Sequence, residues 1–293
     1  MIDDSVDPQE TPERSAAPEG RPKKRLLTRR NFMHFGVGAG IGVIGGGAYA
    51  WQSHRLELVH TRYELRLGSS RAIHVAAISD LHLAGSPEDY ALLLQRVREA
   101  SPDLILVVGD TVDHPRGYEL VSILAEIDAP LGKFACLGNW DCSLHVDEEE
   151  VARALARAGV RLLVNEGVQV GGINLVGLDD WVFGVPDLSV VPKFAAAGPT
   201  LVMAHCPAIF DDLIAQGDQQ DGISPYLVIS GHTHGGQIAP FGIAPYTPYG
   251  SSRYVQGWYH HAQADLYVMR GIGFSNIQLR IGSRPELTIF ELT

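Results

Sequence analysis

The feature that most constrains the fold is a repeated alternation of apolar segments and helix-like segments. Three segments are almost entirely apolar, as in strands that are buried on both faces: residues 72–79, 103–108 and 133–137. Each is followed by a segment in which apolar residues recur with helical spacing: 87–100, 118–127 and 148–158. This alternation predicts a parallel sheet covered by helices.

Beyond Gly159 the pattern changes to short apolar runs that are broken by glycines. Residues 56–67 predict an edge strand. Further strands are predicted over 160–163, 168–170, 173–176, 200–204 and 226–230, with antiparallel strands over 253–255, 266–269 and 286–290. One two-sheet sandwich with helices outside accommodates all of them.

Five of the predicted strands end in polar side chains. The ends carry Asp80 and His82, then Asp110, Asn139, His205, and finally His232 and His234. Because ligands bind at the carboxyl ends of strands in open α/β sheets, we expect these seven side chains to converge. Glycines such as Gly231 and Gly235 beside the last pair would let the backbone approach a ligand closely.

A set of oxygen and imidazole donors without thiolates suits Mn, Fe or Zn. Seven ligands are too many for one ion, whereas two ions that share Asp110 would use them all. Two ions about 3.5–4 Å apart can activate a hydroxide and hold a phosphoryl oxygen. The sequence therefore predicts a centre of two divalent or trivalent metal ions.

The N-terminus has the character of a targeting segment. Residues 1–27 are polar and Pro-rich, which predicts a disordered tail of basic and acidic residues. Residues 28–50 resemble a twin-arginine signal, with Arg29-Arg30 followed by an apolar run from Phe35 to Trp51. This segment is either cleaved after Ala50 or kept as a membrane anchor. Both alternatives predict export by the twin-arginine machinery to the outer face of the cytoplasmic membrane or elsewhere in the cell envelope.

Charge and cysteine content exclude some classes of protein. A net charge of -11 gives no sign of the basic patches that nucleic-acid-binding proteins carry. Three cysteines cannot all pair, so we expect buried free thiols, with a Cys136–Cys142 disulfide as the alternative.

The strand-end motifs, taken together, resemble those of the calcineurin-like metallophosphoesterase superfamily. They are Asp80-x-His82, Gly109-Asp110-x-x-Asp113, Gly138-Asn139-x-Asp141, His205 and Gly231-His232-x-His234. The N-terminal signal and Arg284-Pro285-Glu286 resemble the exported bacterial phosphodiesterase branch. The resemblance implies a metallophosphoesterase domain over 51–293, with α/β class and a four-layer α/β/β/α sandwich of two mixed sheets. It also implies one metal on Asp80, His82, Asp110 and His234, and the other on Asp110, Asn139, His205 and His232.

Trp140 departs from the family pattern, which usually has His at this position. A tryptophan cannot accept or deliver a proton at neutral pH, although Asp113 and Asp141 are present and are expected to support the ligands. Loss of an acid hinders poor leaving groups more than good ones, such as the phosphate end of a pyrophosphate. UDP-2,3-diacylglucosamine pyrophosphatases of this superfamily also lack the His. Alternatively, His114 or His145 supplies the proton.

These observations predict a hydrolase that cleaves a phosphodiester or pyrophosphate bond through a hydroxide activated by two metals. A lipid- or nucleotide-linked envelope substrate such as UDP-2,3-diacylglucosamine, acted on at a membrane surface, fits the predicted location. The alternative is a non-catalytic metal-bound envelope protein that binds a phosphorylated ligand.

Overall fold

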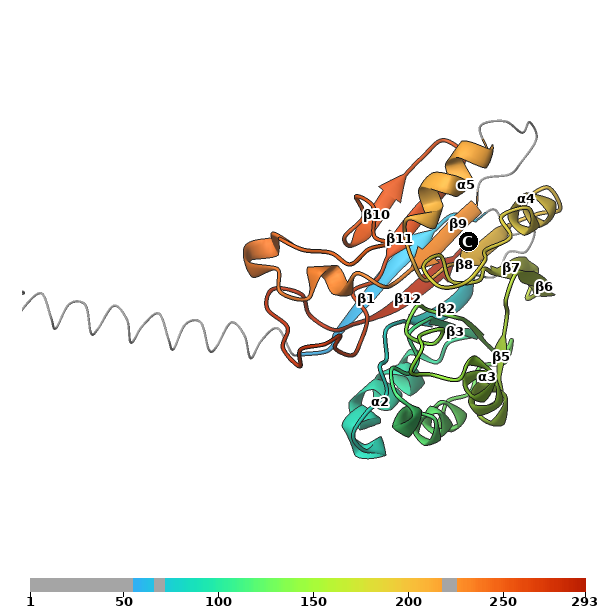
Figure 1. Ribbon diagram of the computed structural model, residues 1–293. Coiled ribbons are helices and arrows are strands. Elements are labelled where there is room, and N and C mark those ends of the chain that lie inside the picture. The colour runs from blue at the N-terminus through green and yellow to red at the C-terminus, as the bar shows by residue number, and fades with distance from the viewer. Residues whose placement is uncertain (1–54, 66–71, 218–225) are drawn as a thin grey trace, which may run out of the picture. The chain divides into compact units, whose positions relative to one another are not determined.

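The computed structural model describes residues 55–65, 72–217 and 226–293. Their strands form two six-stranded sheets, in the orders β1-β12-β2-β3-β4-β5 and β10-β11-β9-β8-β7-β6 (Figure 1). The strands of the first sheet are β1 (Glu57–Tyr63), β2 (Ile73–Ile78), β3 (Leu104–Val108), β4 (Lys133–Cys136), β5 (Val160–Leu162) and β12 (Glu286–Leu292). Those of the second are β6 (Glu166–Val170), β7 (Ile173–Gly177), β8 (Thr200–Met203), β9 (Tyr226–Ser230), β10 (Gly257–His260) and β11 (Ala264–Val268).

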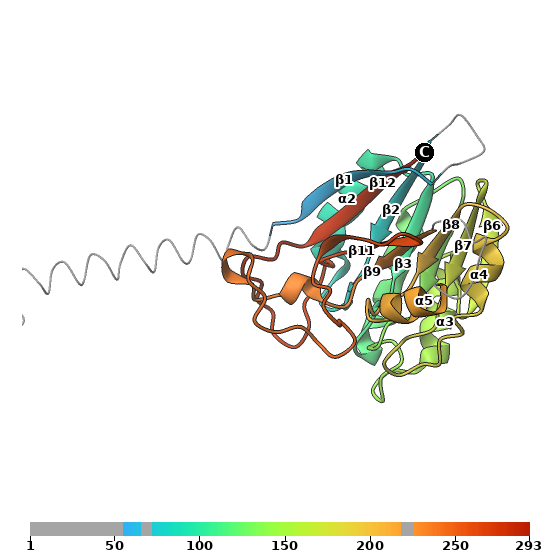
Figure 2. The same cartoon turned by 90° about the horizontal axis from the view of Figure 1, so that it is seen from above.

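Helices cover the outer face of each sheet, on opposite sides of the sandwich (Figures 1 and 2). The first sheet is covered by α2 (Ala91–Ala100), α3 (Glu148–Arg157) and the 3-10 helix η3 (Glu119–Glu126). The second sheet is covered by α4 (Val190–Ala195) and α5 (Ile209–Gly217). Shorter 3-10 helices occur at η1 (Pro87–Tyr90), η2 (Pro115–Gly117), η4 (His234–Gly236) and η5 (Pro240–Gly242).

Alternation along the strands produces three apolar layers. On β2, Ala76 and Ile78 pack against the helices, whereas Val75 and Ala77 face the second sheet. On β9, Leu227 and Ile229 face the first sheet, and Val228 packs beneath the outer helices. Strands buried on both faces explain why these segments are continuously apolar.

Both sheets are mixed. β2 to β5 run parallel, while β12 pairs antiparallel with β2 and parallel with β1. In the second sheet, β7, β8, β9 and β11 run parallel, and β6 and β10 are antiparallel edge strands. The predicted class, an α/β sandwich of two mixed sheets covered by helices, is confirmed.

Several local predictions differ from the structure. The helix predicted over 118–127 is a 3-10 helix, and α4 and α5 were not predicted. The strand predicted over 253–255 is wrong, because the chain turns there and Tyr254 is buried with its hydroxyl donating to Asp211. Cys136 and Cys142 are free thiols, so the alternative of a disulfide is wrong.

The two N-terminal predictions, a tail over 1–27 and a signal or anchor over 28–50, lie outside the described residues. Within 55–65, 72–217 and 226–293, no helix has both the length and the apolar character that a bilayer span requires.

Candidate metal centre

The carboxyl ends of β2, β3, β4, β8 and β9 deliver all seven predicted side chains to one place. Backbone hydrogen bonds tie these loops together: His82 N–H donates to the Asp110 carbonyl at 3.0 Å, and Gly231 N–H to the His205 carbonyl at 3.0 Å. The His232 N–H donates to Asp80 Oδ1 at 2.8 Å. The loops therefore form one structure in which the position of each candidate ligand depends on the others.

The buried residues Asp80, His82 and His234 form the first group, and their ligand atoms all lie within 4.8 Å of one another. His234 Nε2 is 3.4 Å from Asp80 Oδ1 and 3.1 Å from His82 Nε2. Ligand atoms at these separations could share one metal ion.

The buried residues Asp110, His205 and His232 form the second group, which meets the same 4.8 Å limit. His205 Nε2 lies 3.1 Å from Asp110 Oδ2, and Asn139 Oδ1 lies 2.7 Å from His232 Nδ1. Asp110 also joins the groups, because the same Oδ2 is 3.7 Å from His82 Nε2. The two groups therefore meet at Asp110.

Hydrogen bonds at the outer edge of the cluster orient the imidazoles. His205 Nδ1 donates to the Val108 carbonyl at 2.9 Å, which turns Nε2 toward Asp110. His232 Nε2 donates to the Tyr249 carbonyl at 2.9 Å, so the Nδ1 lone pair faces Asn139 Oδ1. Hydrogen bonds of this kind fix the tautomer of metal-binding histidines.

The donor set fits a cation. His232 Nδ1 and Asn139 Oδ1 are two acceptors that face each other, and a cation between them would satisfy both. Asp80 Oδ2 is buried and has no hydrogen-bond partner among the described residues. Carboxylate, amide and imidazole donors without a thiolate are the set that Mn, Fe and Zn accept.

The electrostatics of the cluster also favour positive charge. Burial alone would lower the pKa of His205, but the Asp110 carboxylate outweighs it and raises that pKa to about 10. Burial would raise the pKa of Asp110, but His205 and other histidines lower it to about 2. The carboxylates thus favour the protonated form of His205, and a bound metal ion would displace that proton.

The imidazoles of His232 and His234 are held neutral, the form that binds metals. Burial, followed by the charge of His205, lowers the pKa of His232 to about 4. Burial and then Arg280 hold the pKa of His234 well below its ordinary range.

Arg280 is a component of the site that sequence reasoning missed. It is fully buried, with Nη2 at 3.1 Å from His234 Nδ1. The guanidinium donates to the carbonyls of Gly273 and Arg270 at 2.6 and 2.8 Å. No motif marks this arginine, so the sequence carries no signal that could have identified it.

Asp113 and Asp141 also lie at the centre, in different roles. Asp113 Oδ2 is 3.8 Å from His82 Nδ1, on the side of the ring away from the cluster. The buried Asp141 accepts backbone N–H groups of Thr111, Val112 and Gly138. It therefore braces the loops after β3 and β4 against each other.

Trp140 stands beside the first group. Its ring meets His82 edge to face at a centroid distance of 6.0 Å, and the backbone N–H of Trp140 donates to Asp110 Oδ1 at 2.8 Å. His114 is exposed, and its Nδ1 accepts the Arg116 N–H to cap η2. His145 is exposed in a turn, and no contact among the described residues joins it to the cluster. Neither histidine lies among the candidate ligands.

Several candidate ligands have backbone φ angles that are unusual for their residue types and that the sequence did not indicate. Positive φ angles occur at five of the seven candidates: Asp80, His82, Asp110, His232 and His234. This conformation is uncommon for residues with a Cβ and clusters at functional sites. Gly109, with φ of 72°, has no room for a Cβ because the His205 ring lies against it.

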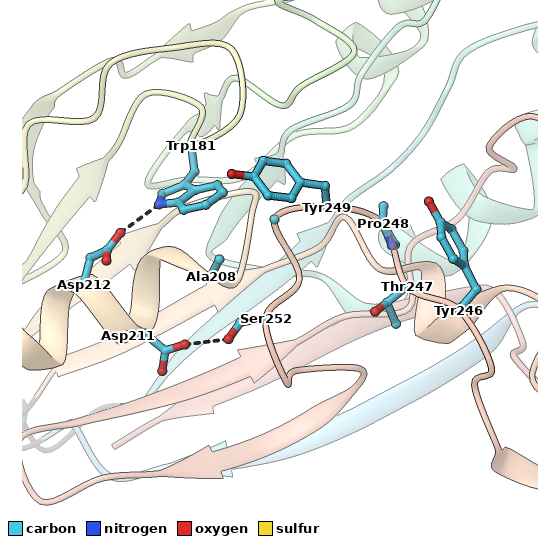
Figure 3. Close-up of a pocket in the computed structure, with 10 residues that line it drawn as sticks. Trp181, Ala208, Asp211, Asp212, Tyr246, Thr247, Pro248, Tyr249 and Ser252 are labelled. Carbon is cyan, nitrogen blue, oxygen red and sulfur yellow. Dashed lines mark hydrogen bonds between the residues drawn. The ribbon is translucent and has the colours of Figure 1, made fainter.

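Among the described residues, two cavities lie near the cluster, and the smaller of these two has candidate ligands in its wall. The smaller, of about 420 Å³, has His232 and His234 in its wall. The larger, of about 650 Å³, is lined by Trp181 and Tyr249 among others (Figure 3), and contains none of the seven candidates. There the Asp212 carboxylate accepts the Trp181 indole N–H (Figure 3), so this acidic group is already engaged within the protein.

Comparison with known proteins identifies the family. The calcineurin-like phosphoesterase family model matches residues 73–236, more than half of the chain. The uncharacterized metallophosphoesterase YkuE of Bacillus subtilis is 29% identical over 290 residues, which cover 92% of this chain and 98% of YkuE. YkoQ, an uncharacterized metallophosphoesterase of the same organism, is 28% identical over 243 residues, covering 77% of this chain and 86% of YkoQ.

Among solved structures, the NAD nucleotidase NadN of Haemophilus influenzae is similar with a TM-score of 0.45 and 15% identity, covering 68% of this chain and 45% of the nucleotidase. The family match includes the residues of both ligand groups, from Asp80 to His234. The chain belongs to the calcineurin-like phosphoesterase family and is a metallophosphoesterase.

Proposed function

We propose that this metallophosphoesterase hydrolyses a phosphodiester or pyrophosphate bond at a centre of two metal ions, Mn, Fe or Zn. One ion would be held by Asp80, His82, Asp110 and His234, and the other by Asp110, Asn139, His205 and His232. The observation that carries this proposal is the convergence of both ligand groups on the Asp110 carboxylate, with imidazoles oriented from outside.

Two ions bound there would neutralise phosphoryl oxygens. Their positive charge would also lower the pKa of water, so that hydroxide is available to attack phosphorus. The protein's own contribution is to hold the donors in place. The Val108 and Tyr249 carbonyls orient His205 and His232, while Asp113 lies beyond His82. Asp141 keeps the loops of Asp110 and Asn139 together, so the donors are positioned before substrate binds.

Trp140 favours substrates with a good leaving group. The indole is a hydrogen-bond donor that does not ionise, and it occupies the position next to His82. His114 caps η2 instead of reaching the cluster. A phosphodiester of a phenol, or a pyrophosphate whose leaving group is a phosphate, needs no proton from the protein. A pyrophosphate on a nucleotide-linked envelope lipid, such as UDP-2,3-diacylglucosamine, meets this requirement.

Hydrolysis of bis(p-nitrophenyl) phosphate by the full chain with added Mn tests the proposal. Asp110→Ala and His232→Ala are expected to lose activity by at least about 10³-fold, because each removes a donor that fixes an ion. His60→Ala, at an exposed histidine on edge strand β1, is the matched control and keeps its activity. Hydrolysis that persists in Asp110→Ala, or in protein stripped of metal, contradicts the assignment.

The same assay separates the hydrolase from its alternative, a metal-bound envelope protein that only binds a phosphorylated ligand. Trp140 is the observation that favours the alternative, since it replaces the usual His. Turnover of the wild-type chain excludes a purely binding role, whereas tight binding without turnover would support it.

We also propose export through the twin-arginine machinery, which places the enzyme at the outer face of the membrane or in the cell envelope. The support is the Arg29-Arg30 motif followed by the apolar run from Phe35. Replacing both arginines by lysine should leave the full-length protein in the cytoplasm, as measured by fractionation. Unchanged export of that variant would contradict this route.

A further inference from the structure

The cavity that opens onto the ligand cluster has a mainly apolar surface, although Thr233, Gln237, Ser275 and Asn276 also line it. Its wall contains Ile238, Pro245 and Ile277, together with the ring of Tyr246. We call it the apolar cavity. Its volume of about 420 Å³ is within the range of small-molecule sites. A phosphorus group held near His232 and His234 would therefore lie at the mouth of a space suited to hydrocarbon.

Two loops that are far apart in sequence form this cavity. The Gln237 amide joins them, since its Nε2 donates to the carbonyls of Ser275 and Ile277, and its Oε1 accepts the Ser275 N–H. The Ala239 N–H donates to the Ile281 carbonyl at 2.7 Å. The cavity is therefore built by long-range contacts and does not depend on one mobile loop.

The same two loops expose large apolar side chains around the cavity. Of the nine exposed large apolar residues among those described, five belong to these loops: Phe241, Ile243, Tyr246, Tyr249 and Ile277. Phe241 is 90% exposed at the tip of η5. An exposed apolar patch that borders a binding cavity is a common sign of contact with an apolar ligand or a membrane.

This patch lies at the end of the domain where the described chain begins. Figures 1 and 2 both show the loops at the end from which β1 starts, and Arg284 Nε donates to the Arg55 carbonyl there.

We infer that the apolar cavity takes the hydrocarbon chain of an amphiphilic phosphoester, whose phosphorus lies at the ligand cluster. The inference rests on the proposed function and specifies its substrate as lipid-like. The larger cavity does not suit this role. None of the seven candidate ligands lines it, and its lining includes the carboxylates of Asp211 and Asp212.

The test uses diesters of p-nitrophenol that differ in one group: methyl, butyl and octyl p-nitrophenyl phosphate, each below its critical micelle concentration. Water attacks phosphorus, the P–O bond to the aryl group breaks, and p-nitrophenol and the alkyl phosphate are released. The leaving group is identical throughout, so only the alkyl chain alters kcat/KM. Each methylene that enters the cavity should raise kcat/KM by up to about fourfold. The butyl diester has three methylenes more than the methyl diester, so its kcat/KM should be up to about sixtyfold higher.

Substitutions at Ile277 and Leu92 test whether the alkyl chain binds in the apolar cavity. Ile277→Gln should reduce the octyl-to-methyl ratio of kcat/KM by at least about tenfold, and the conservative Ile277→Met should restore it. Leu92→Gln is the matched control, because Leu92 on α2 is 50% exposed and Ile277 is 56% exposed. The octyl-to-methyl ratio of kcat/KM for Leu92→Gln should equal that of wild type.

The outcomes distinguish the two proposals. A wild-type enzyme that hydrolyses the methyl diester with no dependence on chain length overturns the inference and leaves the proposed function intact. A dependence that Ile277→Gln and Leu92→Gln retain equally also overturns it, because the chain then binds elsewhere. Failure to hydrolyse any of the three diesters refutes the proposed function itself.

Discussion

Replacement of Asp141 tests whether this buried carboxylate braces the two ligand loops. Asp141 Oδ2 accepts the N–H groups of Thr111 and Gly138 at 3.2 and 3.0 Å, and Oδ1 accepts that of Val112 at 3.0 Å. All of these groups are buried. Asp141→Ala leaves three donors without a partner, at about 1–3 kcal/mol each, or roughly 3–9 kcal/mol in total. Stabilities of natural domains are only about 5–15 kcal/mol, so this loss is severe.

Asp141→Asn is the matched comparison. Its oxygen can keep the two bonds made by Oδ2, and only the Val112 N–H loses its acceptor. Burial and the neighbouring Asp110 raise the pKa of Asp141 to about 7, and both substitutions remove this unfavourable carboxylate. The Ala and Asn variants therefore differ by two hydrogen bonds, or roughly 2–6 kcal/mol.

Urea unfolding followed by circular dichroism measures this difference. A chelator is present in all samples, because metal binding to the native state alone would add its own stabilisation. Asp141→Ala should unfold at clearly lower urea than Asp141→Asn. Equal free energies of unfolding for the two variants would refute the bracing role.

Three further changes probe other parts of the site. Trp140→His should raise kcat/KM for diesters with alkyl leaving groups by about 10²-fold and for nitrophenyl diesters much less; equal gains on both would contradict the assigned effect of Trp140. Arg280→Met leaves the Gly273 and Arg270 carbonyls without their buried donor and should lower the free energy of unfolding by roughly 2–5 kcal/mol, measured in urea; an unchanged midpoint would show that these bonds contribute nothing. Gly138→Ala places a Cβ against the backbone N and side chain of Asp110 and should lower kcat by about 10²-fold; wild-type kcat would show that the loop adapts.

The architecture and the ligand cluster could be predicted because both depend on a repeating local pattern. A strand buried on both faces must be apolar throughout, so the polar residues that end it are conspicuous, as at Ser79-Asp80 and Gly109-Asp110. Parallel strands then bring these ends to one edge of the sheet. Local sequence was a poorer guide at 253–255, where burial of Tyr254 against Asp211 requires a turn.

Other features of the site arise only from contacts between distant segments. Arg280 is 46 residues from His234, the residue that it contacts. The positive φ angles of Asp80 and His82 follow from packing of the loops and not from residue type. The apolar cavity exists because Gln237 joins two loops, which no spacing in the sequence indicates. The export signal over 28–50 stays a prediction.

The most direct test of the account is anomalous diffraction at the manganese absorption edge, from crystals of the full chain grown with Mn. The account predicts two peaks, one surrounded by Asp80, His82 and His234 and the other by Asn139, His205 and His232, with Asp110 between them. A single peak, or peaks outside these two groups, would contradict the dinuclear centre on which the proposed hydrolysis depends.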